Sequence, residues 1–397
     1  MNYSWREGNQ ADLLATGEDY FSRVFACIHE AREEVLLETF RIAEDDVGLA
    51  LQQALIAAAN RGVRVELTAD NYGTHDLSPS FVSAMTDAGV HVHLFAPAPR
   101  LFGCRTTRFR RLHRNVLVID GEHAFIGSFA YSTGHSTPGA AQNYALAVRG
   151  PVVADIHRDA LNQLPDAGRQ ANPIKPVTRH AGSARLRLTV RDNDTHTHDI
   201  ESEYLRIIQA STQRLVIASA CFFPRYPLLR EIRNAARRGV KVTLLLQGQA
   251  HMPWAYGFSR LLYDYLLRDG VVIHEYDQAI LHGKVALADH EWVSVGSSNL
   301  DPLSLALNLE ANLMVRDAPV NRSLHDHLLE QAHTHCRPVE LQPATRGYWW
   351  RIPLIVLGFQ CLRHFPALAG WFPAHTPRRP LIDAEQAHLQ YDSENAA

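Results

Sequence analysis

Short apolar runs alternate with amphipathic stretches along most of the chain. The segments "AANRGVRVEL" (58–67) and "AARRGVKVTL" (235–244) each predict the end of a helix, a glycine that stops it and a following strand. The segments "DAGVHVHLF" (87–95) and "RDGVVIHEY" (268–276) predict the same succession. The apolar runs are continuous rather than alternating, which is typical of a sheet covered by helices on both faces. We therefore expect an α/β fold.

The pattern of the first half of the chain returns in the second half. The apolar strand "EEVLLETF" has a counterpart in "QRLVIASACFF", and the paired segments lie about 170 to 180 residues apart. A stretch rich in proline, glycine and polar residues separates the halves and is predicted to be a linker. We expect an approximate two-fold relation that places equivalent segments across a shared cleft. The predicted units are an N-terminal domain (1–165), a linker (166–184), a C-terminal domain (185–335) and a C-terminal segment (336–397).

Composition narrows the functional class. The 397 residues are long enough for two compact domains. A formal net charge of -3 argues against a protein that coats nucleic acid through bulk electrostatics. The five cysteines form no C-x-x-C pair, which argues against a disulfide framework or a structural zinc site. Histidine is abundant, but neither "HTH" triplet has a known zinc spacing, so we expect no catalytic metal and no cofactor. The first residues do not have the pattern of a signal peptide.

Two segments of equal length, "LHRNVLVIDGEHAFIGS" and "LHGKVALADHEWVSVGS", carry the candidate chemistry. In the second copy His282 and Lys284 stand two apart on a predicted strand and therefore point to one face. Ser297 and Asn299 share a face of the returning strand. Such a hairpin gathers an imidazole, an ammonium, a hydroxyl and an amide. Those groups suit a phosphodiester, because the nitrogen donors bind its oxygens and an imidazole can attack phosphorus or transfer a proton.

The duplication itself has a chemical reason. In-line displacement at phosphorus needs a neutral imidazole on one side and an imidazolium on the side of the leaving oxygen. One histidine cannot do both at once, whereas a motif repeated about a two-fold supplies His113 and His282.

The full pattern resembles the signature of the phospholipase D superfamily, H-x-K-x4-D-x6-G-[GS]-x-N in two copies. The segments "SWREGN", "ETFRIAEDDVG", "RLFGCRTTRFRRLHR", "VGSSNLDPLSLALNLEAN" and "RHFPALAGWFPAHTPR" resemble the B-type branch of the bacterial cardiolipin synthases. The resemblance covers nearly the whole chain. It implies two tandem phospholipase D-like α/β/α sandwich domains that pass a phosphatidyl group through a phosphohistidine to the hydroxyl of another lipid. The residues that it implies to be catalytic are His113, Asp120, His282, Lys284 and Asp289, and those implied to bind phosphate are Asn115, Ser128, Ser297 and Asn299.

The resemblance also implies an acid that holds the active histidine. Glu310 has that position in the second copy, where we expect it to fix the tautomer of His282 and raise its basicity. Its counterpart in the first copy is Asn143. We therefore expect His282 to be the nucleophile and His113 to be the acid, although the opposite assignment is compatible with the sequence.

The first copy has lost three of the family's residues. Asn115 replaces the lysine, Ala130 replaces the G-S-x-N asparagine, and Asn143 replaces the acid. Arg114 does not restore the cation, because strand alternation turns its side chain to the opposite face from His113. Losing one donor to a transition-state oxygen costs roughly 3–4 kcal/mol, or about a hundred- to a thousand-fold in rate. We expect an asymmetric site that still works.

Two segments are predicted to contact lipid. Residues 346–375 are the most apolar part of the chain, but their longest uninterrupted apolar run is far shorter than the roughly 20 residues that span a bilayer. Tryptophan and arginine near the ends suit a segment lying in the headgroup layer, and a helix packed on the domain is the alternative. A basic run just before His113 is expected to gather anionic headgroups, unless it is a solvated loop. Its candidate residues are Arg100, Arg105, Arg108, Arg110 and Arg111.

The leading interpretation is a phosphatidyltransferase that makes cardiolipin from phosphatidylglycerol and a second phospholipid, which phosphatidylethanolamine could be. We expect it to lie on the cytoplasmic face of a bacterial membrane. A hydrolytic phospholipase D would use the same residues with water as the acceptor. A membrane-bound scaffold that keeps only an anion-binding pocket is the reading favoured by the substitutions in the first copy. An endonuclease of the same superfamily would be shorter and more basic. The sequence leaves the oligomeric state open.

Overall fold

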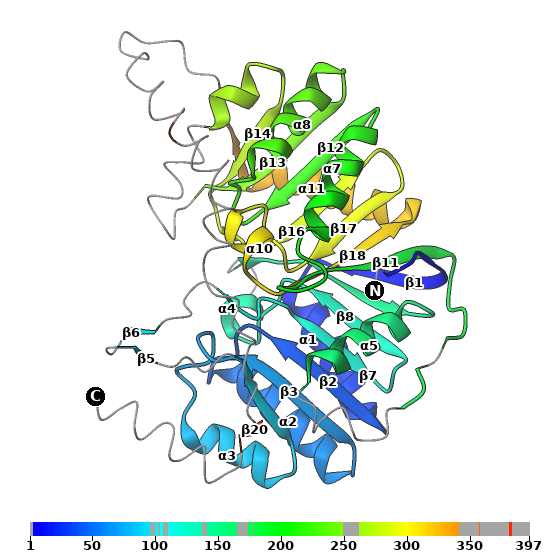
Figure 1. Ribbon diagram of the computed structural model, residues 1–397, viewed down its shortest axis with the longest axis vertical. Coiled ribbons are helices and arrows are strands. Elements are labelled where there is room, and N and C mark those ends of the chain that lie inside the picture. The colour runs from blue at the N-terminus through cyan, green and yellow to red at the C-terminus, as the bar shows by residue number, and fades with distance from the viewer. Residues whose placement is uncertain are drawn as a thin grey trace.

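The computed structural model describes residues 3–95, 100–101, 104–105, 110–136, 141–164, 174–176, 178–248, 262–340, 357 and 381–382. Strands and helices alternate along both halves of the chain, which confirms the predicted α/β class. In Figure 1 the N-terminal half, blue to cyan, forms the lower part of the molecule, and the C-terminal half, green to orange, forms the upper part.

One sheet joins the two halves. Its strand order in the described residues is β19-β14-β13-β12-β16-β17-β18-β11-β1-β10-β8-β7-β2-β3-β4-β20. The strands from the first half are β1 (Arg6–Leu14), β2 (Glu34–Thr39), β3 (Arg64–Asp70), β4 (His91–Phe95), β7 (Val116–Ile119), β8 (His123–Gly127) and β10 (Ala145–Arg149). Those from the second half are β11 (Ala184–Arg191), β12 (Arg214–Ser219), β13 (Lys241–Gln247), β14 (Val272–Tyr276), β16 (Lys284–Ala288), β17 (Trp292–Gly296) and β18 (Glu310–Arg316).

The edges of this sheet come from the last part of the chain. Strand β19 (Cys336–Pro338) pairs with β14, and β20 (Leu381–Ile382) pairs with β4. Shorter pairings link β5 (Arg100–Leu101) to β6 (Cys104–Arg105) and β9 (Ala141–Gln142) to β15 (Ile280–Leu281).

The strand order reveals the internal symmetry. Strands β1 and β11 pair in the middle, and outward from them β10, β8, β7, β2, β3 and β4 match β18, β17, β16, β12, β13 and β14. In each half the three strands from β2 and from β12 run parallel to one another, and the motif hairpin lies antiparallel beside them. The sheet therefore passes from one half to the other without a break, and the predicted domain boundaries stay a prediction.

Helices cover the sheet (Figure 1). Those of the first half are α1 (Gly17–Glu30), α2 (Asp46–Asn60), α3 (Pro79–Asp87), α4 (Thr133–Ser136) and α5 (Val153–Gln163). Those of the second half are α7 (Asp199–Ala210), α8 (Tyr226–Arg237), α10 (Pro302–Ala306) and α11 (Ala318–Thr334). Side-chain caps fix several of their starts, as Asp45 does for α2 and Asp317 for α11.

The predicted helix stops are confirmed. Gly62 and Gly239 follow α2 and α8 with φ of 85° and 91°, a conformation that glycine adopts without a steric penalty. Gly89 and Gly270, with φ of 91° and 86°, precede β4 and β14 in the same way. The two halves thus use the same local rule to turn each helix back into the sheet.

Buried apolar side chains hold the halves together. One cluster includes Val116 and Leu146 from the first half and Leu186, Val293 and Leu313 from the second. Separate clusters lie under the helices of each half. Because burying one such side chain stabilises by about 1.5–3 kcal/mol, the shared cluster makes the relative position of the motifs costly to change.

Most of the C-terminal segment expected to contact lipid lies outside the described residues. Leu357, from within it, is exposed. Among the described residues, no helix combines the length and hydropathy of a membrane span.

Candidate active site

Each motif histidine lies two or three residues before the first strand of a hairpin. His113 comes before β7 and His282 before β16. The prediction that His282 and Lys284 share a face is confirmed, because Lys284 Nζ lies 2.9 Å from His282 Nε2. Lys284 Nζ also donates to the carbonyl oxygen of His282 at 2.7 Å.

The two halves exchange partners at this point. The backbone N–H of His113 donates to the carbonyl of Leu309 at 3.0 Å, and its Nδ1 lies 3.0 and 3.1 Å from the carboxylate oxygens of Glu310. In the opposite direction, the N–H of His282 donates to Gln142 O at 2.9 Å, and its Nδ1 lies 2.8 Å from Asn143 Oδ1. Each histidine is therefore held by the half that does not contain it.

This exchange corrects one expectation. Glu310 pairs with His113, not with His282, and the side chain beside His282 is the amide of Asn143. Glu310 is close to His282 in sequence, but the residue that it contacts, His113, lies 197 positions away. The prediction assumed that the acid serves the histidine of its own motif, whereas the fold carries it across the centre of the sheet.

Charge and burial set the two histidine environments apart. Burial lowers the pKa of His282 well below 6.5, and the neighbouring Lys284, His135 and His113 lower it further. Burial also lowers the pKa of Lys284 to about 7, against the opposing effect of the Glu310 carboxylate. His282 is thus a neutral imidazole beside an amine that is charged below about pH 7, while His113 faces a carboxylate that is fully buried.

The motif serines hydrogen-bond to Glu310 and Asn143, the two side chains that contact the histidines. Ser297 Oγ donates to Glu310 Oε2 at 2.5 Å, and Ser128 Oγ donates to Asn143 Oδ1 at 3.1 Å. Both serines are buried, and each also accepts a backbone N–H from the strand beside it. Their hydroxyls are committed to Glu310 and Asn143, and a role for Ser128 and Ser297 in binding phosphate stays a prediction.

The motif aspartates bind backbone N–H groups. Asp120 accepts the backbone N–H groups of Arg32, Glu33 and Glu34, and Asp289 accepts those of Thr212, Gln213 and Arg214. They occupy equivalent turns with φ of 50° and 49°. Burial raises and these donors lower the pKa of Asp289, with a net downward shift. Both carboxylates tie the hairpin turn to the start of β2 or β12, at the far end of the hairpin from the histidines, so their catalytic role stays a prediction that these contacts do not support.

The asparagines at the two copies differ in their contacts. Asn115 Oδ1 accepts from Thr39 Oγ1 at 3.0 Å and from the N–H of Phe40 at 3.3 Å, which ties it to the end of β2. The side-chain oxygen of Asn299 is buried and has no hydrogen-bond partner among the described residues. A role for Asn115 and Asn299 in binding phosphate stays a prediction.

The basic run is only partly described. Arg108 and the side chains of Arg100 and Arg105 lie outside the described residues. Arg111 lies 3.8 Å from Asp70 and stacks its guanidinium 4.5 Å from the centre of the Tyr72 ring. Burial lowers the pKa of Arg110. Contact of this run with headgroups stays a prediction.

The interpretation of Arg114 is confirmed. Its buried guanidinium pairs with Asp159 and, at 2.8 Å, with Glu38. It therefore points into the protein on the α5 side and contributes no cation to the histidines.

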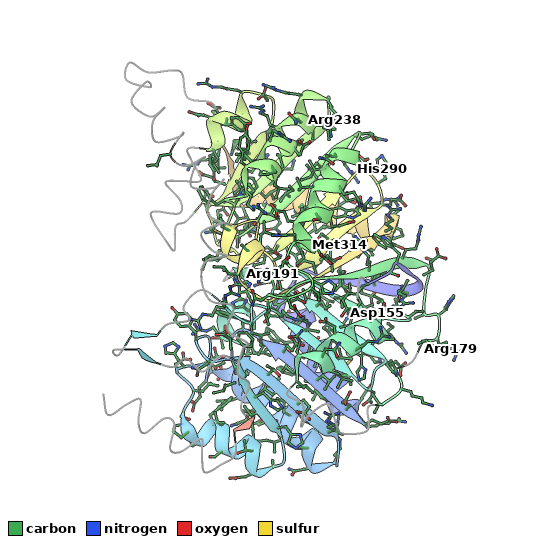
Figure 2. All side chains as sticks on the ribbon, viewed as in Figure 1. Asp155, Arg179, Arg191, Arg238, His290 and Met314 are labelled. Atoms are coloured by element: carbon green, nitrogen blue, oxygen red, sulfur yellow. The ribbon has the colours of Figure 1, made fainter. Side chains whose placement is uncertain are left out.

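One residue at this site, His135, lies outside the predicted set. The His135 ring lies edge-on to the His282 ring, with 4.9 Å between their centroids. His135 is on α4, outside the repeated signature, and its counterpart in the second half is Ser304. No sequence signal distinguished it from the other scattered histidines. Figure 2 shows Arg191 at the junction of the two halves, where burial lowers its pKa to about 10.

Comparison with known proteins agrees with this architecture. Residues 24–162 and 204–331 match the family model described as "Cardiolipin synthase, PLD-like domain". Cardiolipin synthase B of Escherichia coli K12 is 47% identical over 391 residues, which cover 96% of this chain and 95% of that protein. Cardiolipin synthase A of Pseudomonas putida is 31% identical over 336 residues, 83% of this chain and 70% of that protein.

The fold is also shared with more distant enzymes. The crystal structure of phosphatidylserine synthase from Haemophilus influenzae superposes with a TM-score of 0.66 at 13% identity, covering 90% of this chain and 96% of that one. Three observations support the same family: the duplicated hairpins, the pairing of β1 with β11 and the similarity along nearly the whole chain. The chain belongs to the phospholipase D-like cardiolipin synthase family.

Proposed function

We propose that this protein is a cardiolipin synthase-type phosphatidyltransferase. The observation that carries the proposal is the pair of motif histidines, each held through Nδ1 by the opposite half of the chain. A histidine held in this way presents Nε2 to a substrate, as a phosphohistidine mechanism requires. The similarity to Cardiolipin synthase B along 96% of the chain supports the same reaction.

His113 is the nucleophile in this proposal. When Nε2 bonds to phosphorus, the ring becomes a cation, and the Glu310 carboxylate beside Nδ1 stabilises it. The sequence had favoured His282 because Glu310 was expected beside it. The same physical argument now points to His113.

His282 and Lys284 act on the leaving group. His282 donates Nδ1–H to the amide oxygen of Asn143, so Nε2, unprotonated in the neutral ring, is the atom that takes up a proton from solvent when the substrate anion binds and then passes it on. A bound phosphodiester anion draws the Lys284 ammonium toward its oxygens and raises the pKa of His282, because an opposite charge favours the protonated ring. As the bond from His113 to phosphorus forms, the bond to the headgroup oxygen breaks, and that oxygen takes the proton of His282.

The second step reverses the roles of the groups. His282, now neutral, removes the proton from an acceptor hydroxyl, and that oxygen displaces His113 from phosphorus. Phosphatidylglycerol supplies the phosphatidyl group and releases glycerol in the first step, and a headgroup hydroxyl of a second phospholipid is the acceptor in the second. Water as the acceptor would give phosphatidic acid instead, which is the hydrolytic alternative.

Substrate and location follow from the same proposal. The substrates are anionic phospholipids, with phosphatidylglycerol as one of them, and the protein works peripherally on the cytoplasmic face of the bacterial membrane. The apolar segment 346–375 makes the membrane contact. The N-terminal domain (1–165) supplies His113 and the C-terminal domain (185–335) supplies His282, so both are needed for one site.

The test uses the full chain with labelled phosphatidylglycerol vesicles, with and without phosphatidylethanolamine. We expect labelled cardiolipin from the wild type and none from His113→Ala or His282→Ala. After an acid-free quench, the wild type should carry label on the protein, whereas His113→Ala should not, because only His113 forms the adduct.

The other outcomes identify the alternatives. Phosphatidic acid as the sole product would support a hydrolase. Vesicle binding without any product would support a scaffold, which the losses at Asn115, Ala130 and Asn143 favour. His290→Ala is the matched control, because His290 is exposed on the turn beside Asp289, away from the junction of the halves (Figure 2).

A further inference from the structure

The two copies of the motif differ at the position that follows the glycine–serine pair. Asn299 has that position in the second half, and its buried side-chain oxygen has no partner among the described residues, as expected for an amide whose contacts come from a ligand. The equivalent residue of the first half is Ala130, which has no polar side-chain atom. The isolated bridges Ile42–Tyr131 and Phe222–Leu300 confirm that Ala130 and Asn299 are structurally equivalent.

His135 lies over the backbone of Ala130. The N–H of Ala130 points to His135 Nδ1 at 3.4 Å. The same ring packs edge-on against His282, whose Nδ1 is bound to Asn143. His135 therefore brings a polar group beside the position that the alanine left without one.

The hydrogen bond from Ala130 also determines which nitrogen of His135 carries the proton. A ring nitrogen that accepts from a backbone N–H is unprotonated, so the proton of the neutral ring lies on Nε2. Burial, followed by the charge of Lys284, lowers the pKa of His135 to about 4, which keeps the ring neutral at physiological pH. His135 is thus a neutral N–H donor, as the amide of an asparagine is. A hydrogen bond with the Asn143 side chain acts on the same ring and opposes the lowering of its pKa, so a phosphate oxygen would take the place of that amide at Nε2.

The turn that carries His135 is anchored on both sides. Asp45, the cap of α2, accepts from the N–H of Thr133 at 2.8 Å and from its hydroxyl at 3.0 Å. At Gly17, the start of α1 comes so close that an added Cβ would lie 2.4 Å from the carbonyl oxygen of His135. Such anchoring preorganises the ring, which is what a donor to a developing oxyanion needs.

We propose that His135 binds a non-bridging oxygen of the transferred phosphate through Nε2–H, and so replaces the donor that Ala130 lacks. This inference deepens the proposed function and rests on it, because it assigns a third histidine to the same site. His135 takes no part in proton transfer or bond formation. Arg41 pairs with Asp76 at 3.5 Å, and its positive charge also lowers the pKa of His135.

The test separates a donor from a space-filling ring. Binding of inorganic tungstate, a tetrahedral oxyanion, is measured by calorimetry with full-length protein, and cardiolipin formation is measured in parallel. We expect His135→Ala to weaken tungstate binding by roughly three- to tenfold and to slow transfer by at least as much, since one neutral hydrogen bond is lost. His290→Ala serves as the control for removal of a histidine.

A double variant makes the test decisive. In the His135→Ala background, Ala130→Asn should restore most of the tungstate affinity, because it returns an amide donor to the position of Asn299. The proposal is overturned if His135→Ala binds tungstate as the wild type does, or if Ala130→Asn restores nothing. A wild type that does not bind tungstate counts against this inference, whatever its activity.

The tungstate measurement is independent of lipid chemistry. If the wild type makes no cardiolipin but the variants change tungstate binding as expected, the proposed reaction fails and the oxyanion site stands. If cardiolipin forms and His135→Ala binds tungstate as tightly as the wild type does, the proposed reaction stands and this inference fails.

Discussion

The two halves of the site are built on one plan but hold their histidines with different groups. His113 is backed by the carboxylate of Glu310, and His282 by the neutral amide of Asn143. The first motif copy is the one that lost residues, yet its own histidine keeps the acid. The loss at Asn143 falls on the histidine of the intact copy. The loss of signature residues from one motif copy therefore does not show that the histidine of that copy has lost its supporting acid, because each histidine is held by the other half.

The largest effect should come from exchanging these two backing groups. Glu310→Gln is expected to lower the rate of cardiolipin formation roughly 100- to 1000-fold, because an amide cannot neutralise the cationic adduct on His113. Asn143→Asp should raise the pKa of His282 and change the rate far less. Initial rates with labelled phosphatidylglycerol measure both. A loss below tenfold in Glu310→Gln would contradict the assignment of His113 as the nucleophile.

Removal of the remaining motif lysine should rank next. Lys284→Met is expected to slow transfer by about 100-fold, since one preorganised donor to the phosphate is lost. Lys241→Met is the matched control, because Lys241 is an exposed residue at the start of β13. Equal rates for the two variants would show that Lys284 contributes nothing to phosphate binding.

The same lysine predicts a pH dependence. Burial lowers the pKa of Lys284 to about 7, so its ammonium is present below that pH and is lost as the pH rises through it. The rate should fall by up to tenfold per pH unit above this value. In Lys284→Arg the falling limb should move to higher pH, because a guanidinium keeps its charge. If the falling limb of the pH–rate profile is at the same pH in Lys284→Arg as in the wild type, the titrating group is not Lys284.

Restoring the lysine of the first copy should have a smaller effect of opposite sign. Asn115→Lys is expected to raise the rate by up to about tenfold, since a cation returns to that side of the phosphate. The substitution gives up the hydrogen bonds of Asn115 with Thr39 and Phe40, so the free energy of unfolding should fall by about 1 kcal/mol. Rate and thermal unfolding are measured together, and a slower folded variant would contradict the asymmetry argument.

The smallest effect on the rate is expected at the motif aspartates. Asp120→Asn and Asp289→Asn should each lower the free energy of unfolding by about 1–3 kcal/mol, because each weakens charge-assisted bonds to three backbone N–H groups. The rate constant of the folded protein should stay unchanged. Denaturant unfolding and active-site-normalised rates distinguish this from a catalytic role, which would lower the rate without changing stability.

Much of the fold could be predicted because it follows local rules. The helix stops at Gly62 and Gly239 and the apolar strands that follow them are set by backbone freedom and by continuous burial. The common face of His282 and Lys284 follows from strand geometry alone. The direction of Arg114, away from His113, follows from the same alternation.

The tasks of individual motif residues could not be predicted in this way. Aspartate and serine appear in the signature beside the histidines, but Asp289 lies at the far end of the hairpin and Ser297 supports Glu310. Neither contact is visible in the spacing, because each depends on which strand lies next to the hairpin. His135 was missed for the same reason, since it belongs to α4 and not to the repeat.

The sequence by itself determined the alternation of helix and strand, the duplication and the residue types at the two histidine motifs. Only the tertiary structure decided that Glu310 serves His113 and that Asn143 serves His282. The physical reason is that strands β1 and β11 join the halves into one sheet. The bridge between Leu112 and Leu309 then brings the first motif to the second half, and the pairing of Leu281 with Gln142 brings the second motif to the first half. Contacts between residues so far apart in the chain are fixed by packing, which no local pattern encodes.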